Sequence, residues 1–170
     1  IAGNALGALL CVASVDGDVL NAAAALKEFS ALRGRGARFS AGGVEVIDES
    51  YNANPASMGV ALALLAKAPG RRVAVLGDML EMGPDGGVHH AGLAPAIEAA
   101  GTDLVFLCGP QMKSLWGALP VKLRTAYAAT SAELATALVA TLKPGDTVLV
   151  KGSNGIRMSV IIEALKARGA

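Results

Sequence analysis

The chain has 170 residues and a net charge of +1; 53% of its residues are hydrophobic, but only 4% are aromatic. This length suits one α/β domain, alone or with part of a second. The near-zero charge gives no electrostatic basis for binding nucleic acid or an anionic membrane. The apolar runs are shorter than the about 20 residues of a membrane helix, and no signal-peptide pattern opens the chain. Because it begins with Ile1 rather than Met, we expect a fragment of a cytoplasmic protein.

The first part of the chain predicts two helices, over residues 5–15 and 19–30. The basic, glycine-rich stretch "RGRGARFSAGG" (33–43) follows and lacks an apolar period, so we interpret it as a loop and as the best candidate for a domain boundary. Cys11 and Cys108 stand in apolar runs without a CxxC partner. Both are therefore expected to be buried thiols in a reducing compartment.

From residue 44 onward, short runs rich in β-branched residues alternate with helical patterns. The predicted strands are 44–48, 72–78, 103–109 and 146–152, with a weaker one at 124–129. Pro55 and Asn54 mark the start of one helix, and Thr130 with Glu133 forms the capping-box pattern of another. This alternation predicts an α/β domain over 44–170, with a mostly parallel sheet covered by helices on both faces. Ligands bind such sheets at the carboxyl ends of the strands.

One of these strand ends carries the run "IDESYNANP", which has more polar side chains than a turn requires. Asn54 is explained as a helix cap. Asp48, Tyr51 and Asn52 are left over, and we favour a binding site there over a purely structural junction.

A second strand end, "VLVKGSNGIRM", delivers Lys151 and then a turn that opens a helix. Free amides at a helix start together with a lysine suit a carboxylate or a phosphate. The spacing is not that of a Walker A loop. The alternative is an ordinary strand-to-helix turn with an exposed lysine.

Three further features leave their roles open. Asp78 and Glu81, in "VLGDMLEMG", could cap the next element or face a ligand. The pair His89 and His90 is a poor chelate, because neighbouring helical residues point about 100° apart. Three arginines of the boundary loop could contact phosphate or simply be solvated; these are Arg33, Arg35 and Arg38.

Taken together, "DESYNANPASM", "AVLGDMLEMG", a following histidine and "VLVKGSNGIRM" resemble the C-terminal part of the Mur ligases in order and spacing. The upstream "NALGALLCVAS" and "RGRGARF" resemble that family's sequence before its last domain. The resemblance implies that residues 1–43 are the tail of the central ATPase domain. Residues 44–170 would be the complete Rossmann-like C-terminal domain.

The resemblance also implies an activity. Mur ligases form an amide bond with ATP and Mg²⁺ through an acyl phosphate. The motifs point to the member that joins D-alanyl-D-alanine to UDP-N-acetylmuramoyl-tripeptide in peptidoglycan synthesis. The phosphate loop, the catalytic residues and the magnesium ligands would lie upstream, so this fragment alone should not turn over. It would supply part of the ATP site and the dipeptide site.

Site residues follow from the same resemblance. Those expected to contact ATP come from both parts of the chain: Asn4, Arg35, Asp48, Tyr51 and Asn52. Of the boundary arginines, Arg35 fits best. Those expected at the amino-acid substrate are Asn54, Lys151 and Ser153. Of the two histidines, the spacing from Gly83 favours His90, and the pattern supports no metal there.

Two other readings stand beside the ligase fragment. A free-standing α/β module that binds a small carboxylate or a nucleotide would explain "VKGSNG" but not the two helices and basic loop before residue 44. A small complete enzyme using Asp48, His90 and Lys151 lacks an evident nucleophile.

Overall fold

The computed structural model describes residues 2–28 and 31–168. The chain divides into two compact units, with the boundary between Ala31 and Leu32, and each unit is described by itself. The first holds α1 (Ala2–Ser14), α2 (Val19–Ala25) and the short η1 (Leu26–Glu28). The predicted helices are confirmed here, except that residues 29–30 lie outside the described residues. Asp18 caps α2 by accepting a hydrogen bond from the Asn21 amide at 2.9 Å.

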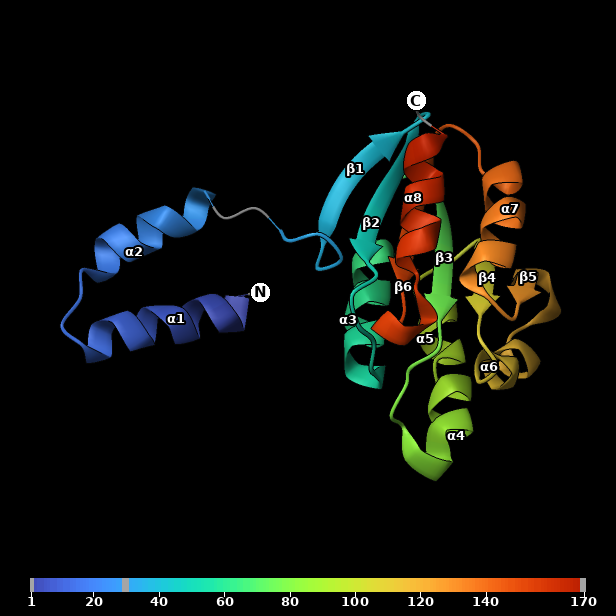
Figure 1. Cartoon of the computed structure of the whole chain (residues 1–170), viewed down its shortest axis with the longest axis horizontal. Helices are drawn as coiled ribbons and strands as arrows, with labels where there is room; N and C mark the ends of the chain where they lie inside the picture. The colour runs from blue at the N-terminus through green and yellow to red at the C-terminus, as the bar shows by residue number, and fades with distance from the viewer. Residues whose placement is uncertain (1, 29–30, 169–170) are drawn as a thin grey trace. The chain divides into compact units, whose positions relative to one another are not determined.

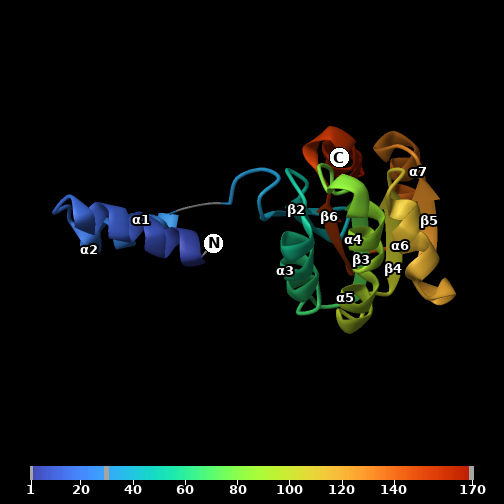
Figure 2. The same cartoon turned by 90° about the horizontal axis from the view of Figure 1, so that it is seen from below.

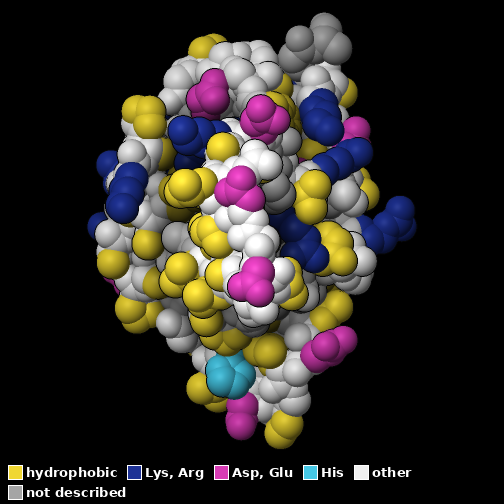
Figure 3. Space-filling view, turned by 90° about the vertical axis from the view of Figure 1, so that its left-hand side faces the viewer, with side chains coloured by type: hydrophobic (Ala, Val, Ile, Leu, Met, Phe, Trp, Pro, Cys, Tyr) yellow, Lys and Arg dark blue, Asp and Glu magenta, His cyan; other side chains and the backbone are white. Residues whose placement is uncertain are grey.

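This two-helix unit buries little of its apolar surface. Of the large hydrophobic side chains in its two main helices and their connection, Leu9, Val12 and Val19 are half-buried, and the others are exposed: Leu6, Leu10, Val15 and Leu20. Figure 3 shows many hydrophobic side chains at the surface of the face that it draws. Cys11 is exposed as well, so the expectation of a buried thiol is wrong for it and confirmed only for Cys108.

The second unit is built on one six-stranded sheet with the order β1-β2-β6-β3-β4-β5 (Figure 1). The strands are β1 (Ala37–Ala41), β2 (Val44–Glu49), β3 (Arg71–Gly77), β4 (Leu104–Cys108), β5 (Arg124–Ala128) and β6 (Asp146–Lys151). β1 is antiparallel to β2, and the other neighbours are parallel. The predicted α/β class and mostly parallel sheet are confirmed.

Strand β1 lies in the stretch that we expected to be a loop, so that expectation is wrong for residues 37–41. Ala41 pairs with Val44 across a two-residue turn of Gly42 and Gly43, whose φ angles are +57° and +77°. Two-residue hairpin turns of type I′ need positive φ at both positions, and glycine adopts it without strain. The glycines that looked like a flexible loop therefore close a hairpin, and the sheet begins before residue 44.

Helices cover both faces of the sheet (Figures 1 and 2). They are α3 (Pro55–Leu65), α4 (Gly86–Ala91), α5 (Ala94–Ala99), α6 (Met112–Ala118), α7 (Ser131–Thr141) and α8 (Ser159–Ala167). Single 3-10 turns are η2 (Gly83–Asp85), η3 (Val121–Leu123) and η4 (Asn154–Ile156). Alternate strand residues point to opposite faces of the sheet and form two hydrophobic cores. One core packs against α3, α5 and α6, and the other packs against α7 and α8.

Two predicted helix starts have the expected chemistry. The Asn54 side-chain oxygen accepts a hydrogen bond from the Ser57 backbone amide at 2.8 Å, and the Asn54 backbone amide donates to the Ser57 hydroxyl at 3.0 Å. Thr130 and Glu133 form the matching capping box of α7. In the parts of the chain that the structure describes, no helix is long and apolar enough to cross a membrane.

Candidate functional site

A cavity of about 380 Å³ opens where three loops leave the carboxyl ends of β2, β3 and β6. Its walls come from the turn after β2, the segment after β3 and the start of η4: Tyr51, Asn52, Ala53, Asn54, Leu80, Glu81, Met82, Ser153, Asn154 and Gly155. This volume is in the range of small-molecule sites. The structure therefore brings the three sequence motifs into one cavity at the edge of the sheet where parallel α/β folds bind ligands.

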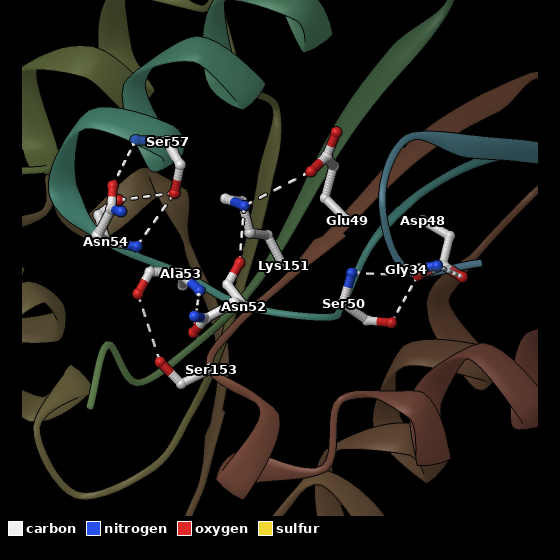
Figure 4. Close-up of polar contacts among 10 residues, drawn as sticks. All are labelled: Gly34, Asp48, Glu49, Ser50, Asn52, Ala53, Asn54, Ser57, Lys151 and Ser153. Atoms are coloured by element: carbon white, nitrogen blue, oxygen red, sulfur yellow. Dashed lines mark hydrogen bonds and ion pairs between the residues drawn. The ribbon is translucent and has the colours of Figure 1, made fainter. Parts of the chain in front are cut away.

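The turn after β2 is tied to the preceding segment by Asp48, whose carboxylate is buried (Figure 4). One carboxylate oxygen accepts from the Ser50 hydroxyl at 2.6 Å and from the Ser50 amide at 3.1 Å. The other accepts from the Gly34 amide at 3.0 Å. Three internal donors thus contact Asp48, and the residue is only 2% exposed. A ribose hydroxyl could reach its second oxygen, which accepts a single hydrogen bond, only after the surrounding turn moves.

Lys151 holds the same turn through its ammonium group. Its ammonium donates to the Asn52 carbonyl at 2.9 Å and lies 3.6 Å from the Glu49 carboxylate (Figure 4). The side chain is only 3% exposed. Burial lowers the pKa of Lys151, and Glu49 opposes that shift. In this arrangement the ammonium holds the turn in place, and a direct contact with a substrate carboxylate would require it to leave these partners.

Ser153 joins two walls of the cavity. Its hydroxyl accepts a hydrogen bond from the Leu80 amide at 2.9 Å and lies 3.4 Å from the Ala53 carbonyl, to which it donates. Its own amide donates to the Asp78 carbonyl at 3.0 Å. Ser153 is buried, so its main contribution in this state is to fix the segment after β3 against the turn after β2.

A buried polar network holds the first residues after β3. The Asp78 carboxylate accepts from the Gln111 and Met112 amides at 3.2 and 2.9 Å. Burial raises the pKa of Asp78, while these two amides oppose the shift. His90 is fully buried; its Nε2 accepts from the Met79 amide at 2.9 Å, and its Nδ1 lies 2.6 Å from the Gly86 carbonyl.

These contacts assign His90 a neutral tautomer with the proton on Nδ1, because Nε2 must be free to accept. Of the two adjacent histidines, His89 is exposed, so His90 alone takes part in the network. The Asp78 carboxylate is buried too and accepts hydrogen bonds from backbone amides.

Arg35 and Tyr51 form a flat surface beside the turn. The Arg35 guanidinium stacks over the Tyr51 ring at 3.9 Å from its centroid, and Tyr51 is 48% exposed. Nearby, Arg33 forms an ion pair with Glu163 of α8. A planar cation and an exposed ring suit a nucleotide, whose base and phosphates offer matching groups. Arg35 and Tyr51 are exposed, whereas the Asp48 carboxylate is buried and accepts three internal hydrogen bonds. Asn4 lies on α1, in the first unit.

Sequence reasoning missed part of the cavity wall. Leu80, Met82, Asn154 and Gly155 line it but carry little chemistry that a sequence pattern could single out. It also overlooked Glu49, the more exposed of the two acids that end β2 (28% exposed). Among the described residues no group of three or more His, Cys, Asp or Glu side chains could hold a metal ion.

The chain is similar to known proteins over most of its length. Residues 34–154 match the family described as "Mur ligase, glutamate ligase domain". The UDP-N-acetylmuramoyl-tripeptide–D-alanyl-D-alanine ligase of Rickettsia prowazekii (strain Madrid E) is 31% identical over 163 residues, which make up 95% of this chain and 36% of that protein. The chain therefore spans about a third of the length of this relative.

Solved structures agree on the fold. A crystal structure of MurF from Acinetobacter baumannii has a TM-score of 0.85 and 26% identity, over 96% of this chain and 37% of that one. The MurF ligase from Thermotoga maritima in complex with ADP has a TM-score of 0.77 over 94% of this chain and 36% of that one. At 23% identity, this second likeness concerns the fold alone.

Proposed function

Because the chain belongs to the Mur ligase family, we propose that it is the C-terminal part of an ATP-dependent ligase that joins D-alanyl-D-alanine to UDP-N-acetylmuramoyl-tripeptide. The single observation that carries the proposal is the cavity at the carboxyl edge, in which the three motifs of the resemblance meet. The 31% identical relative bears the name of this ligase. Such an enzyme would act in the cytoplasm on peptidoglycan precursors.

Within this ligase we assign the two sides of the turn after β2 to different substrates. Arg35 and Tyr51 would bind ATP, together with Asn52 and, after a movement of the turn that uncovers it, Asp48. Asn4 would reach ATP from the central domain. The dipeptide would occupy the cavity beside Asn54, with Ser153 and Lys151 holding its walls.

Other parts of the reaction fall outside this chain. ATP supplies the phosphoryl group that activates the tripeptide carboxylate, and the amine of the dipeptide forms the amide bond. Magnesium ligands and the phosphate loop would come from the missing domains. Since β1 pairs with β2, we also propose that the C-terminal domain begins at or before Ala37 rather than at residue 44.

The test is phosphate release by the full-length ligase with ATP, Mg²⁺, the UDP-muramoyl tripeptide and D-alanyl-D-alanine, each omitted in turn. We expect release only when all are present. Release that ignores the dipeptide would refute the assigned substrate.

The ATP assignment has its own test. Arg35→Ala should raise the KM for ATP, because it removes the stacked guanidinium. Arg38→Ala is the matched control, since Arg38 is an exposed arginine of β1. Equal effects of the two substitutions would remove Arg35 from the nucleotide site.

A further inference from the structure

The cavity has an unusual charge balance for a site that would take a zwitterionic dipeptide. Of its lining residues, all of which the structure describes, Glu81 is the only Asp, Glu, Lys or Arg. Lys151 is a candidate for a balancing cation, but its ammonium donates to the Asn52 carbonyl. The one formally charged residue that lines the cavity is therefore an acid.

Other acids around the cavity are already engaged. Asp48 accepts three hydrogen bonds from Gly34 and Ser50. Glu49 lies 3.6 Å from the Lys151 ammonium. Asp78 is 1% exposed and accepts two amides at the start of α6. Glu81, by contrast, is exposed and makes no side-chain hydrogen bond or ion pair with the described residues. It is the acid that is available to a ligand.

The backbone around Glu81 is held in an unusual conformation. Its φ angle is +63°, in the left-handed region that a glutamate enters at a cost of about 1 kcal/mol or more. The two preceding amides are fixed from outside the segment: Met79 donates to His90 at 2.9 Å, and Leu80 donates to Ser153 at 2.9 Å. Such a conformation persists only when its surroundings hold it. The fold thus keeps a glutamate at the cavity wall at an energetic cost.

We propose that Glu81 binds the ammonium group of the dipeptide substrate and so orients the dipeptide with its amine end toward residues 80–82. This inference rests on the proposed function and adds a specificity-determining residue to it. The ammonium is the only cation of such a dipeptide, and its nitrogen is the atom that forms the new amide bond. A charge-assisted hydrogen bond between carboxylate and ammonium is stronger than a neutral one and fixes direction.

The experiment compares Glu81→Gln with Glu98→Gln in the full-length ligase. Glu98 is an exposed glutamate of α5 that does not line the cavity, so its substitution is a matched change of charge. We expect Glu81→Gln to raise the KM for D-alanyl-D-alanine roughly 10- to 100-fold, the range for losing a hydrogen bond to a charged group. The KM for ATP should stay within about twofold, since Glu81 is not among the residues that we assign to the nucleotide. A dipeptide KM that changes no more than in Glu98→Gln overturns the proposal.

A second measurement separates a direct contact from an effect on the loop. N-acetyl-D-alanyl-D-alanine keeps the carboxylate and both methyl side chains but carries a neutral, bulkier amide in place of the ammonium, and it is tested as a competitive inhibitor. Glu81→Gln should weaken the binding of the free dipeptide and leave the inhibition constant of the acetylated dipeptide nearly unchanged. An equal loss for both ligands would mean that Glu81 acts only through the loop and would overturn the proposal. Phosphate release that never depends on the dipeptide, even in the unsubstituted ligase, would instead refute the proposed function itself.

Discussion

Replacing His90 tests how the wall of the cavity is held, because its two ring nitrogens have separate tasks. Nε2 accepts from the buried Met79 amide, and Nδ1 faces the Gly86 carbonyl. A glutamine places a carbonyl oxygen near the position of Nε2 and preserves the first contact. An asparagine reaches only the position of Nδ1 and preserves the second. The two substitutions therefore remove different hydrogen bonds from the same buried site.

The expected costs differ. In His90→Asn the Met79 amide, whose residue is 0% exposed, loses its acceptor, and an unsatisfied buried donor costs about 1–3 kcal/mol. In His90→Gln the Gly86 carbonyl loses one donor; an under-satisfied carbonyl is better tolerated than an orphaned amide, so we expect a cost of about 0.5–1.5 kcal/mol. His89→Gln is the matched control. Because His89 is exposed, its substitution should change the free energy of unfolding by less than about 0.5 kcal/mol.

The assay is urea unfolding of the chain followed by Trp116 fluorescence. Trp116 is the only tryptophan and lies on α6 beside Tyr127, 6.1 Å between ring centroids, so it reports on the sheet unit. Hydrogen exchange of the Met79 amide, which should accelerate in His90→Asn but not in His90→Gln, gives a local readout. Equal losses of stability for the asparagine and glutamine variants would refute the reasoning, as would a His89→Gln variant that is as unstable as His90→Asn.

Three further predictions concern the frame of the site. Asn54→Ala removes the cap of α3 and should lower the free energy of unfolding by about 1 kcal/mol; an unchanged urea midpoint would contradict this. Gly109→Ala should cost more, because φ is +110° and a Cβ would lie 2.5 Å from Cγ of Asp78; a wild-type midpoint would show that Asp78 can move aside freely. Burial alone would raise the pKa of Asp146, but the Arg71 guanidinium and a backbone amide outweigh it and lower the pKa. Its stabilising effect is therefore present above the unfolded pKa of about 4 and lost as pH falls through the lower folded value. The stability gap between wild type and Asp146→Asn should shrink below about pH 4, and a gap that stays constant from pH 7 to pH 3 would contradict the assignment.

The strands that the sequence pattern predicted most clearly are mostly buried on both faces, because their runs of β-branched residues admit few alternatives; they are β2, β3, β4 and β6. Strand β1 escaped prediction because "ARFSA" is only five residues long with one large apolar side chain, and the glycines on both sides of it indicate a loop as much as a hairpin. The parallel alternation also placed Asp48, Asp78 and Lys151 correctly at the carboxyl edge.

What a sequence pattern cannot give is the direction in which each of these side chains finds its partner. Asp48 and Glu49 are adjacent on β2, so they point to opposite faces of the sheet. Only the pairing of β2 with β6 puts Glu49 beside Lys151. The sequence suggested that Lys151 binds an anion or, alternatively, is exposed in an ordinary turn. The second interpretation is wrong, because the side chain is 3% exposed and enclosed by the turn after β2. Its predicted contact with substrate depends on contacts between segments almost a hundred residues apart in the chain.

The turn of residues 50–54 connects the two proposed substrate sites, and this limits what a single substitution can separate. Asp48 joins the turn to the segment that carries Arg35, and Lys151 and Ser153 join it to the start of η4 (Figure 4). Tyr51 belongs to both, because it stacks under Arg35 and lines the cavity. Removing the Asp48 carboxylate would leave the amides of Gly34 and Ser50 without their acceptor and would loosen the whole turn. A change in ATP affinity after that substitution would therefore carry no information about a direct ribose contact. Arg35 and Glu81 are exposed and take no part in the hydrogen bonds that hold this turn, so they are the positions at which nucleotide and dipeptide binding can be perturbed one at a time.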